Sequence, residues 1–395
     1  MLRTRVGLLL FLLAPAVMAE QAAPTEQPSA TPEPETTPVE PAQTAPEQEP
    51  PAAEEENMAV AAEPTPATPA TPVAPAASAR SKPAGKPAAA SPPRLAVAVR
   101  AARPWSFPAT VSPVLFGSAL AFQVEDSFGP LKLLLTLGTT LGVHAAGNLM
   151  NTLFDFRNGF DGEGSSDQTL VTGALNESQV VQLIWASYGL SALCLAPLSL
   201  LSKAPALHLS LAAALGAASA FVYTGGPGLK YKALGDVLIT STFGPLLVGF
   251  AYMTQAGAIP GLRLLLPALA LSAPIEAILH ANNARDVDED ARNGVVTLAQ
   301  MLGPRHSFGF YAALMATPLV YAAVQACTRS ALGGLPLLAA PLAAELVGQF
   351  KRGEMVGLPK RTAKFQVALG ALMVAAALIP SPPLSSLARW AMGAA

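Results

Sequence analysis

The chain has 395 residues, of which 51% are hydrophobic and 13% are charged, and its mean hydropathy is +0.41. Soluble globular domains carry about 25% charged residues, so the composition argues against a soluble enzyme and against a disulfide-built scaffold. The formal net charge is −2, and no basic stripe could follow a nucleic-acid backbone. Cys194 and Cys327 lie in apolar runs and are interpreted as buried hydrophobic residues. The composition predicts a membrane protein with several spanning segments and no nucleic-acid partner.

The first 93 residues differ from the rest of the chain. Residues 1–19 join two arginines to a short apolar run that ends in small residues, so we expect a signal-like targeting segment there. Residues 20–93 are rich in Pro, Ala, Thr and Glu and contain 18 of the 38 prolines. Such a segment buries too little apolar surface to offset the entropy of ordering, so we expect it to be disordered. The third predicted unit is a membrane domain, residues 94–395.

Nine apolar stretches after residue 103 approach the roughly 20 residues that a helix needs to cross a bilayer. They run over about 106–124, 131–153, 180–201, 205–223, 234–254, 262–281, 308–327, 332–349 and 364–380. The sequence therefore predicts an all-α polytopic membrane protein with nine transmembrane helices. With these spans, 14 Lys and Arg residues fall on one side and five on the other. The positive-inside rule assigns the richer side to the cytosol, the stroma or the matrix.

Acidic and amide side chains gather in two blocks on this positively charged side. The first block begins in the second apolar stretch, where four polar residues recur on one helix face: His144, Asn148, Asn151 and Asp155. Asp161 and Asp167 follow in the loop. The second block repeats the pattern at the end of the sixth stretch, with Glu276, His280, Asn283, Asp286 and Asp290. Both blocks contain an Asn-x-x-x-Asp pair and end near an Arg-Asn-Gly turn, which indicates one motif used twice.

Carboxylates at the end of a membrane helix are costly, so they mark a functional site by default. Clustered oxygen ligands suit Mg²⁺, which prefers a few carboxylates together with substrate phosphates. The sequence has no phosphate-binding loop of the Gly-x-x-x-x-Gly-Lys type and no cysteine and histidine spacing typical of zinc sites. The two blocks therefore predict a diphosphate held between metal ions, with the rest of the substrate in the membrane. Asp288 and Glu289 are interpreted as solvated loop positions.

The Asn-x-x-x-Asp-x-x-x-x-x-Asp motif at 151–161 and the Asp-x-x-x-Asp motif at 286–290 resemble the two aspartate-rich motifs of the UbiA superfamily of intramembrane prenyltransferases. Matching strings at 103–107, 223–226 and 358–364 extend the resemblance over most of the membrane domain. It implies nine helices around a central cavity and two Mg²⁺ ions that bridge the diphosphate. The metal ligands that it implies are Asn151, Asp155, Asp161, Asn283, Asp286 and Asp290, and the four aspartates among them would be catalytic. The substrate-binding residues that it implies are Asn148, Asn151, Arg157, Asp167, Lys230, Asn282, Asn283 and Arg285.

The chain departs from the superfamily pattern at Gln168, where an arginine commonly stands in the sequence Asp-Arg-Thr-Leu. The substitution removes a guanidinium that could bind phosphate in a bidentate manner. Arg157 and Arg285 are the candidates to replace it.

The resemblance implies transfer of a polyprenyl group, with geranylgeranyl as the leading expectation, from its diphosphate to a naphthoquinol-type acceptor in menaquinone (vitamin K₂) synthesis. One alternative is another quinone or phylloquinone branch of the superfamily. A second is a non-catalytic isoprenoid- or sterol-sensing protein that acts through membrane-protein partners, and a third is a transporter with acidic gates. The membrane also stays open between endomembrane (ER/Golgi) and plastid or mitochondrial locations, because the signal-like segment and the positive-inside rule predict opposite sides for residue 94.

Overall fold

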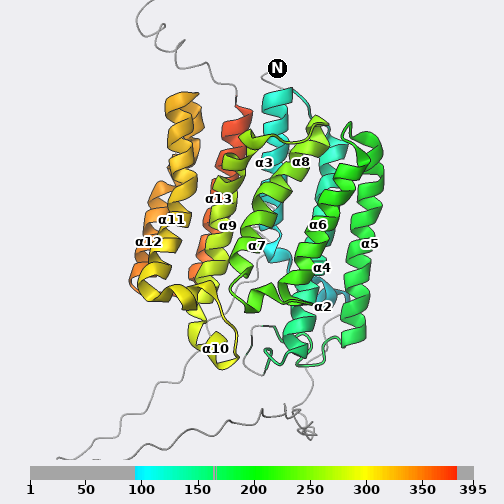
Figure 1. The fold of residues 1–395 in the computed structure, drawn as a ribbon, viewed down its shortest axis with the longest axis vertical. Helices are drawn as coiled ribbons and strands as arrows, with labels where there is room; N and C mark the ends of the chain where they lie inside the picture. Colours follow the sequence, from blue (N-terminus) through cyan, green and yellow to red (C-terminus); the bar gives the residue numbers. More distant parts are fainter. Residues whose placement is uncertain (1–93, 163–164, 166, 380–395) are drawn as a thin grey trace, which may run out of the picture. The chain divides into compact units, whose positions relative to one another are not determined.

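Long apolar helices lie side by side in the part of the chain that the structure describes (Figure 1). The structure is a computed structural model and describes residues 94–162, 165 and 167–379. The predicted targeting segment, 1–19, and the predicted disordered segment, 20–93, lie outside the described residues. The α-helices are α2 (Arg94–Ala101), α3 (Pro108–Glu125), α4 (Pro130–Arg157), α5 (Glu177–Leu201), α6 (Ala206–Thr224), α7 (Gly235–Ser241), α8 (Leu247–Ala256), α9 (Leu265–Arg285), α10 (Val287–Arg292), α11 (Leu298–Thr328), α12 (Ala340–Lys351) and α13 (Leu358–Leu378).

Short helical turns connect or extend several of these helices. They are η1 (Pro104–Ser106), η2 (Leu229–Tyr231), η3 (Thr242–Leu246), η4 (Leu262–Leu264) and η5 (Ala331–Ala339). The turn η3 is a π-helix that contains Pro245 and joins α7 to α8 in one continuous span. Because proline lacks the N–H that an α-helix needs, a local widening at this point is expected.

The predicted fold class is confirmed. Among the described residues, eight helical segments are long and apolar enough to cross a membrane, or nine if the bent pair Leu95–Ser106 and Pro108–Glu125 counts as one span. Each of the nine predicted stretches coincides with a helical segment in this part of the chain. Pro113, Pro274 and Pro318 lie inside α3, α9 and α11, where neighbouring helices make proline tolerable.

Helix ends differ most from the prediction where the first turns are polar. The helix α11 begins at Leu298, where Thr297 and Gln300 form a reciprocal capping box, but its backbone is non-helical at Gly303 (φ 66°, ψ 171°). Its uninterrupted part therefore starts at Pro304, near the predicted 308. The helix α13 begins at Leu358 rather than near 364, with three basic residues in its first two turns. The helix α4 continues to Arg157, so Asp155 lies within it. Apolarity alone underestimates these helices, because their polar turns extend beyond the apolar core of the membrane.

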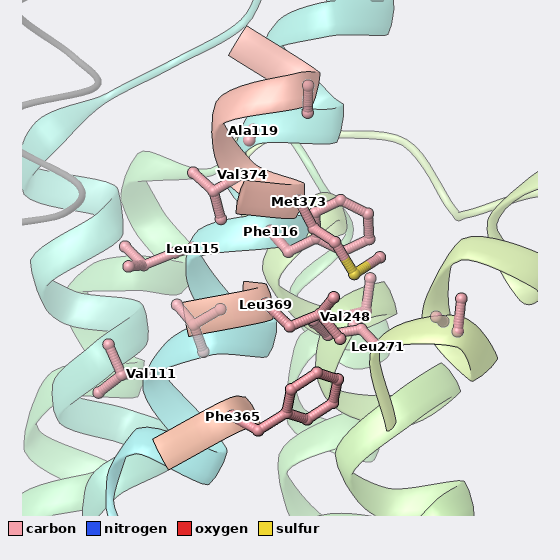
Figure 2. Close-up of a cluster of buried hydrophobic side chains, with 14 of the residues drawn as sticks. Val111, Leu115, Phe116, Ala119, Val248, Leu271, Phe365, Leu369, Met373 and Val374 are labelled. Atoms are coloured by element: carbon pink, nitrogen blue, oxygen red, sulfur yellow. The ribbon is translucent and has the colours of Figure 1, made fainter. Parts of the chain in front are cut away.

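The central packing joins α3 and α13 to α8 and α9 (Figure 2). Phe116 from α3 and Phe365, Leu369 and Met373 from α13 are at most 2% exposed. The helices α3 and α8 approach closely at Gly117, where any side chain would collide with the carbonyl of Val248. Small residues at such contacts let membrane helices pack backbone against backbone.

The helix α9 does not continue through the second acidic block. It ends at Arg285, and Asp286 adopts a non-helical conformation before α10 begins at Val287. The expected single helix face from Glu276 to Asp290 is therefore divided, because the chain turns at Asp286. In Figure 1, α10 lies at the same end of the bundle as α2.

Candidate active site

The first acidic block is organised around Asp155, near the end of α4. This aspartate is 8% exposed. Lys230 Nζ donates to both of its carboxylate oxygens, at 3.0 and 2.8 Å, and the hydroxyl of Tyr231 donates to Oδ1 at 2.7 Å. Both partners belong to η2. Burial, followed by the negative charge of Asp155, raises the pKa of Tyr231, so the phenol stays protonated and serves as a donor.

Asp167 is the second anchor beside α4, and its side chain is largely buried. Its Oδ2 accepts from Arg103 Nη2 at 2.8 Å and from Thr152 Oγ1 at 2.6 Å, and its Oδ1 accepts from the Thr169 N–H at 2.9 Å. Burial works against its charge, but the hydrogen bonds from Thr152, Thr169 and Arg103 hold the pKa of Asp167 down at about 2. Asp167 is therefore a fixed anion that ties the loop after α4 to Arg103.

The charges of both anchors, Asp155 and Asp167, act on Asp161. Burial, and then the negative charges of Asp155 and Asp167, raise the pKa of Asp161 to about 6, although Arg103 and Lys230 act in the opposite direction. Negative charge at this place is thus incompletely balanced by the protein's own cations. An added cation would relieve it.

The second acidic block has fewer internal partners. Arg285 donates from Nε and Nη2 to the two oxygens of Asp286, both at 2.7 Å. Burial, and then the charge of Asp286, raise the pKa of Asp290 to about 6. Asp288 and Glu289 are exposed, as expected, but they lie in α10 rather than in a loop.

Backbone pairing brings the two blocks to one end of the bundle. The segment after η2 meets the segment after α10 through an isolated bridge between Lys232 and Val296. The Ala233 N–H donates to the carbonyl of Val296 at 2.8 Å, and the Val296 N–H donates to the carbonyl of Tyr231 at 3.2 Å. The charges of Lys230 and Asp155 accordingly act on Asp290. Lys230 thus influences acids of both blocks.

An apolar cavity of about 160 Å³ adjoins the first block. It is lined by side chains of α3, α4, α6, α7, η3 and α8. Asn151 and Asn148 line it one and two turns before Asp155, and Tyr223, Phe243 and Leu247 form other parts of its wall. Polar residues on the predicted α4 face therefore lead from the apolar cavity to the acids.

The two asparagines of this wall are held by specific bonds. Asn148 Nδ2 donates to the carbonyl of Ala102 at 2.9 Å and to Ser106 Oγ at 3.0 Å. Asn151 Oδ1 accepts from the hydroxyl of Thr224 at 3.0 Å. The amide nitrogen of Asn148 thus donates both of its hydrogen bonds within the protein.

Other predicted site residues have partners outside the acid cluster. Arg157 Nε donates to Glu177 Oε2 at 2.7 Å on the exposed start of α5. Asn282 Nδ2 donates to the carbonyl of Ile278 in its own helix, at 3.0 Å. Gln168 Nε2 donates to the carbonyls of Gly162 and Ser165, at 2.9 and 2.7 Å. Asn283 is half-buried at the end of α9. Substrate contacts of Arg157, Asn282, Asn283 and Arg285 stay predictions.

Three residues with clear structural roles at the site were not selected from the sequence. Arg103 begins the matching string at 103–107 and Tyr231 follows Lys230, but nothing in their spacing assigns them to Asp167 and Asp155. Thr152 follows Asn148 by one helical turn, which is the signal that could have placed it on the polar face. A guanidinium of the first acidic block therefore comes from Arg103, at Asp167.

With this geometry in place, comparison with known proteins becomes informative. Residues 110–369 match the UbiA prenyltransferase family. The chain belongs to this family. UbiA prenyltransferase domain-containing protein 1 of Gallus gallus is 42% identical over 281 residues, which cover 71% of this chain and 84% of that protein. The Homo sapiens protein of the same name is 43% identical over 278 residues, which cover 70% and 81%.

A solved structure shows the same fold. The apo structure of a UbiA homolog from Aeropyrum pernix K1 has a TM-score of 0.52 and 18% sequence identity, and the match covers 68% of this chain and 96% of that chain. By the family match and its membrane-spanning helices, this chain is an integral membrane protein of the UbiA prenyltransferase family. The predicted family is confirmed.

The acids fit a divalent cation that is shared with a substrate. Among the described residues, no three acidic, histidine or cysteine side chains converge closely enough to enclose a metal ion by themselves. Mg²⁺ seldom uses an all-protein cage and binds through one or two carboxylates plus substrate phosphates. Burial first, and neighbouring carboxylates second, raise the pKa values of Asp161 and Asp290, and a bound cation would favour the charged form of both.

Proposed function

We propose that this protein transfers a polyprenyl group, with geranylgeranyl as the favoured donor chain, from its diphosphate to a naphthoquinol-type acceptor, in the synthesis of a menaquinone. The observation that carries the proposal is the junction of two acidic blocks around Lys230 at the mouth of an apolar cavity. Asp155 is bound by Lys230 at 2.8 Å, and the cavity wall begins one turn earlier at Asn151. A diphosphate at the acids and an isoprenoid chain in the cavity match this division into polar and apolar parts.

The proposed metal ligands are Asn151, Asp155, Asp161, Asn283, Asp286 and Asp290. Two Mg²⁺ ions bound there would supply positive charge that stabilises the leaving diphosphate. Lys230 and Arg103 would add fixed positive charge on the protein side. Asp167 holds Arg103 in place at 2.8 Å.

The proposed reaction has a simple balance. The allylic C–O bond of the donor breaks and its electron pair leaves with the diphosphate. The resulting allylic cation forms a bond to an electron-rich ring carbon of the quinol, and that carbon then loses its proton. The apolar cavity wall keeps water from the cation, because water would convert it to an alcohol.

The curated relatives support the membrane prenyltransferase class but name no acceptor, so the naphthoquinol rests on the resemblance in the sequence strings. The acidic end carries the excess of Lys and Arg, so we propose that it faces the cytosol, the stroma or the matrix. Endomembrane and organellar locations both agree with this orientation.

The proposal is tested with purified full-length protein in detergent, labelled geranylgeranyl diphosphate, menadiol and Mg²⁺. A labelled prenyl-naphthoquinol is expected, and its formation should stop when a chelator removes Mg²⁺. Asp288→Asn serves as the matched acidic control and should retain turnover. A product formed only with a benzoquinol-type acceptor would indicate that the protein belongs to another quinone branch of the superfamily. No product with either acceptor, from protein that binds the donor, would favour the sensing alternative.

A further inference from the structure

His144 is a half-buried histidine that the proposed chemistry leaves without a role. It lies on α4 one turn before Asn148 and lines the cavity. Its Nδ1 is 2.7 Å from Thr110 Oγ1, and its Nε2 is 3.1 Å from Ser106 Oγ. Its ring packs between Phe107 and Phe243, with centroids 5.4 Å away on each side. Both ring nitrogens are thus used on the protein.

The Ser106 hydroxyl connects His144 to the turn at Arg103. The Ser106 hydroxyl has one proton, and it donates this proton to the carbonyl of Arg103 at 2.8 Å. Asn148 Nδ2 donates to the same Oγ at 3.0 Å. With this proton on the Arg103 carbonyl, the Ser106 oxygen accepts from His144 Nε2 and the Thr110 hydroxyl donates to Nδ1. The other tautomer of His144 reverses the direction of both contacts and uses the same partners, since the Ser106 N–H also bonds the Arg103 carbonyl, at 2.9 Å.

This network holds a strained turn. Arg103 adopts φ 53° and ψ 59°, a left-handed conformation that non-glycine residues adopt at a cost. The turn is held by Ser106 on the Arg103 carbonyl and by Asn148 on the Ala102 carbonyl, at 2.8 and 2.9 Å. Beyond it, the Arg103 guanidinium reaches Asp167 at 2.8 Å. A continuous chain of contacts therefore leads from the cavity wall to the acidic site.

We propose that His144 is a positioning residue that locks the 103–106 turn and so keeps the Arg103 guanidinium beside the acids that receive the donor diphosphate. The proposal rests on the proposed function for its kinetic part only. Its structural part, a turn held by His144, is independent of the reaction. A direct contact between His144 and the acceptor in the cavity is the competing role.

The variant His144→Phe keeps a ring between Phe107 and Phe243 and removes both hydrogen bonds. The matched control is His306→Phe, because His306 is exposed and bonds only within its own helix in the described structure. Trp105 belongs to the turn and is 47% exposed, so its fluorescence anisotropy reports on the mobility of the turn. Replacing Trp185 and Trp390 by Phe leaves Trp105 as the sole tryptophan of the three.

His144→Phe is expected to lower the Trp105 anisotropy and to raise the Michaelis constant for the prenyl diphosphate about tenfold, the size of one typical hydrogen bond. The Michaelis constant for the acceptor should stay unchanged. In an Arg103→Gln background, His144→Phe should add no further loss of donor affinity, because both changes act through one guanidinium. His306→Phe should change neither anisotropy nor either constant.

Unchanged Trp105 anisotropy in folded His144→Phe would overturn the proposal, whether or not the protein transfers prenyl groups. A raised acceptor constant that persists in the Arg103→Gln background would also overturn it, because His144 would then act on the acceptor. If His144→Phe does not fold, Thr110→Val removes the bond to Nδ1 with little change in shape. Its anisotropy and donor constant should then shift in the same directions, and their constancy would contradict the proposal.

Discussion

The acidic block after α4 and the acidic block after α9 share a motif, but the protein holds them differently. Asp155 and Asp167 each accept several hydrogen bonds from distant parts of the chain, and their side chains are 12% exposed. Asp286 is 32% exposed and pairs with its chain neighbour Arg285. The first block is thus built into the bundle, whereas the second lies on a turn between α9 and α10. We infer that the first block is a preformed cradle and the second completes the site around the substrate.

The largest expected effect comes from removing one carboxylate of either block. Asp155→Asn and Asp286→Asn should each lower turnover by about a hundred- to a thousandfold, because both would share one charged group in the transition state. The double variant should be little worse than either single variant, since residues that act as a unit are non-additive. Steady-state kinetics with Asp288→Asn as the control gives the comparison. Near-normal turnover for Asp155→Asn would show that the first block takes no part in the reaction.

Substitutions in the two blocks should differ in how much they lower the free energy of unfolding. Asp155→Asn weakens the bonds to Lys230 and Tyr231 and should reduce stability by about 1–2 kcal/mol, a cost typical of disturbed buried hydrogen bonds. Asp286→Asn loses a half-exposed pair and should change stability by less than about 1 kcal/mol. Thermal unfolding in detergent without substrate measures both. Equal losses would mean that the second block is as preformed as the first.

The apolar cavity can be altered without touching either acidic block. A side chain at Gly216 meets no atom within 4 Å, and this glycine lines the cavity. Gly216→Leu should therefore fill space that the isoprenoid chain uses and should shift the preference about tenfold from geranylgeranyl to geranyl diphosphate, as measured by competition. Gly189→Leu, on the exposed face of α5, is the matched control. An unchanged preference would place the chain elsewhere.

The smallest effect is expected at Gln168. Its side chain bonds the carbonyls of Gly162 and Ser165, while Arg103 already supplies a guanidinium at Asp167. Gln168→Arg should thus lower the Michaelis constant for the donor by less than about tenfold and leave that for the acceptor unchanged. Initial-rate measurements decide the point. A higher donor constant would mean that the loop contacts of Gln168 contribute more to the site than a second guanidinium does.

Much of the fold follows from the sequence, because a helix is the structure that lets a single apolar segment satisfy its backbone inside a membrane. Asn148, Asn151 and Asp155 were also predictable, since helical spacing alone places them on one face. The break at Asp286 was not, because no proline or glycine marks it. The partners of Asp155 and Asp167 lie 76 and 64 residues away in the chain. Helical periodicity carries no information at such separations.

The two acidic blocks, around Asp155 and Asp286, are proposed to bind one diphosphate together. Equilibrium binding of labelled geranylgeranyl diphosphate to purified protein, titrated with Mg²⁺ and without acceptor, tests this claim most directly. We predict Mg²⁺-dependent binding that is lost in Asp155→Asn, lost in Asp286→Asn and retained in Asp288→Asn. Wild-type binding by Asp286→Asn together with loss in Asp155→Asn would contradict the claim, because the first block would then bind the diphosphate alone.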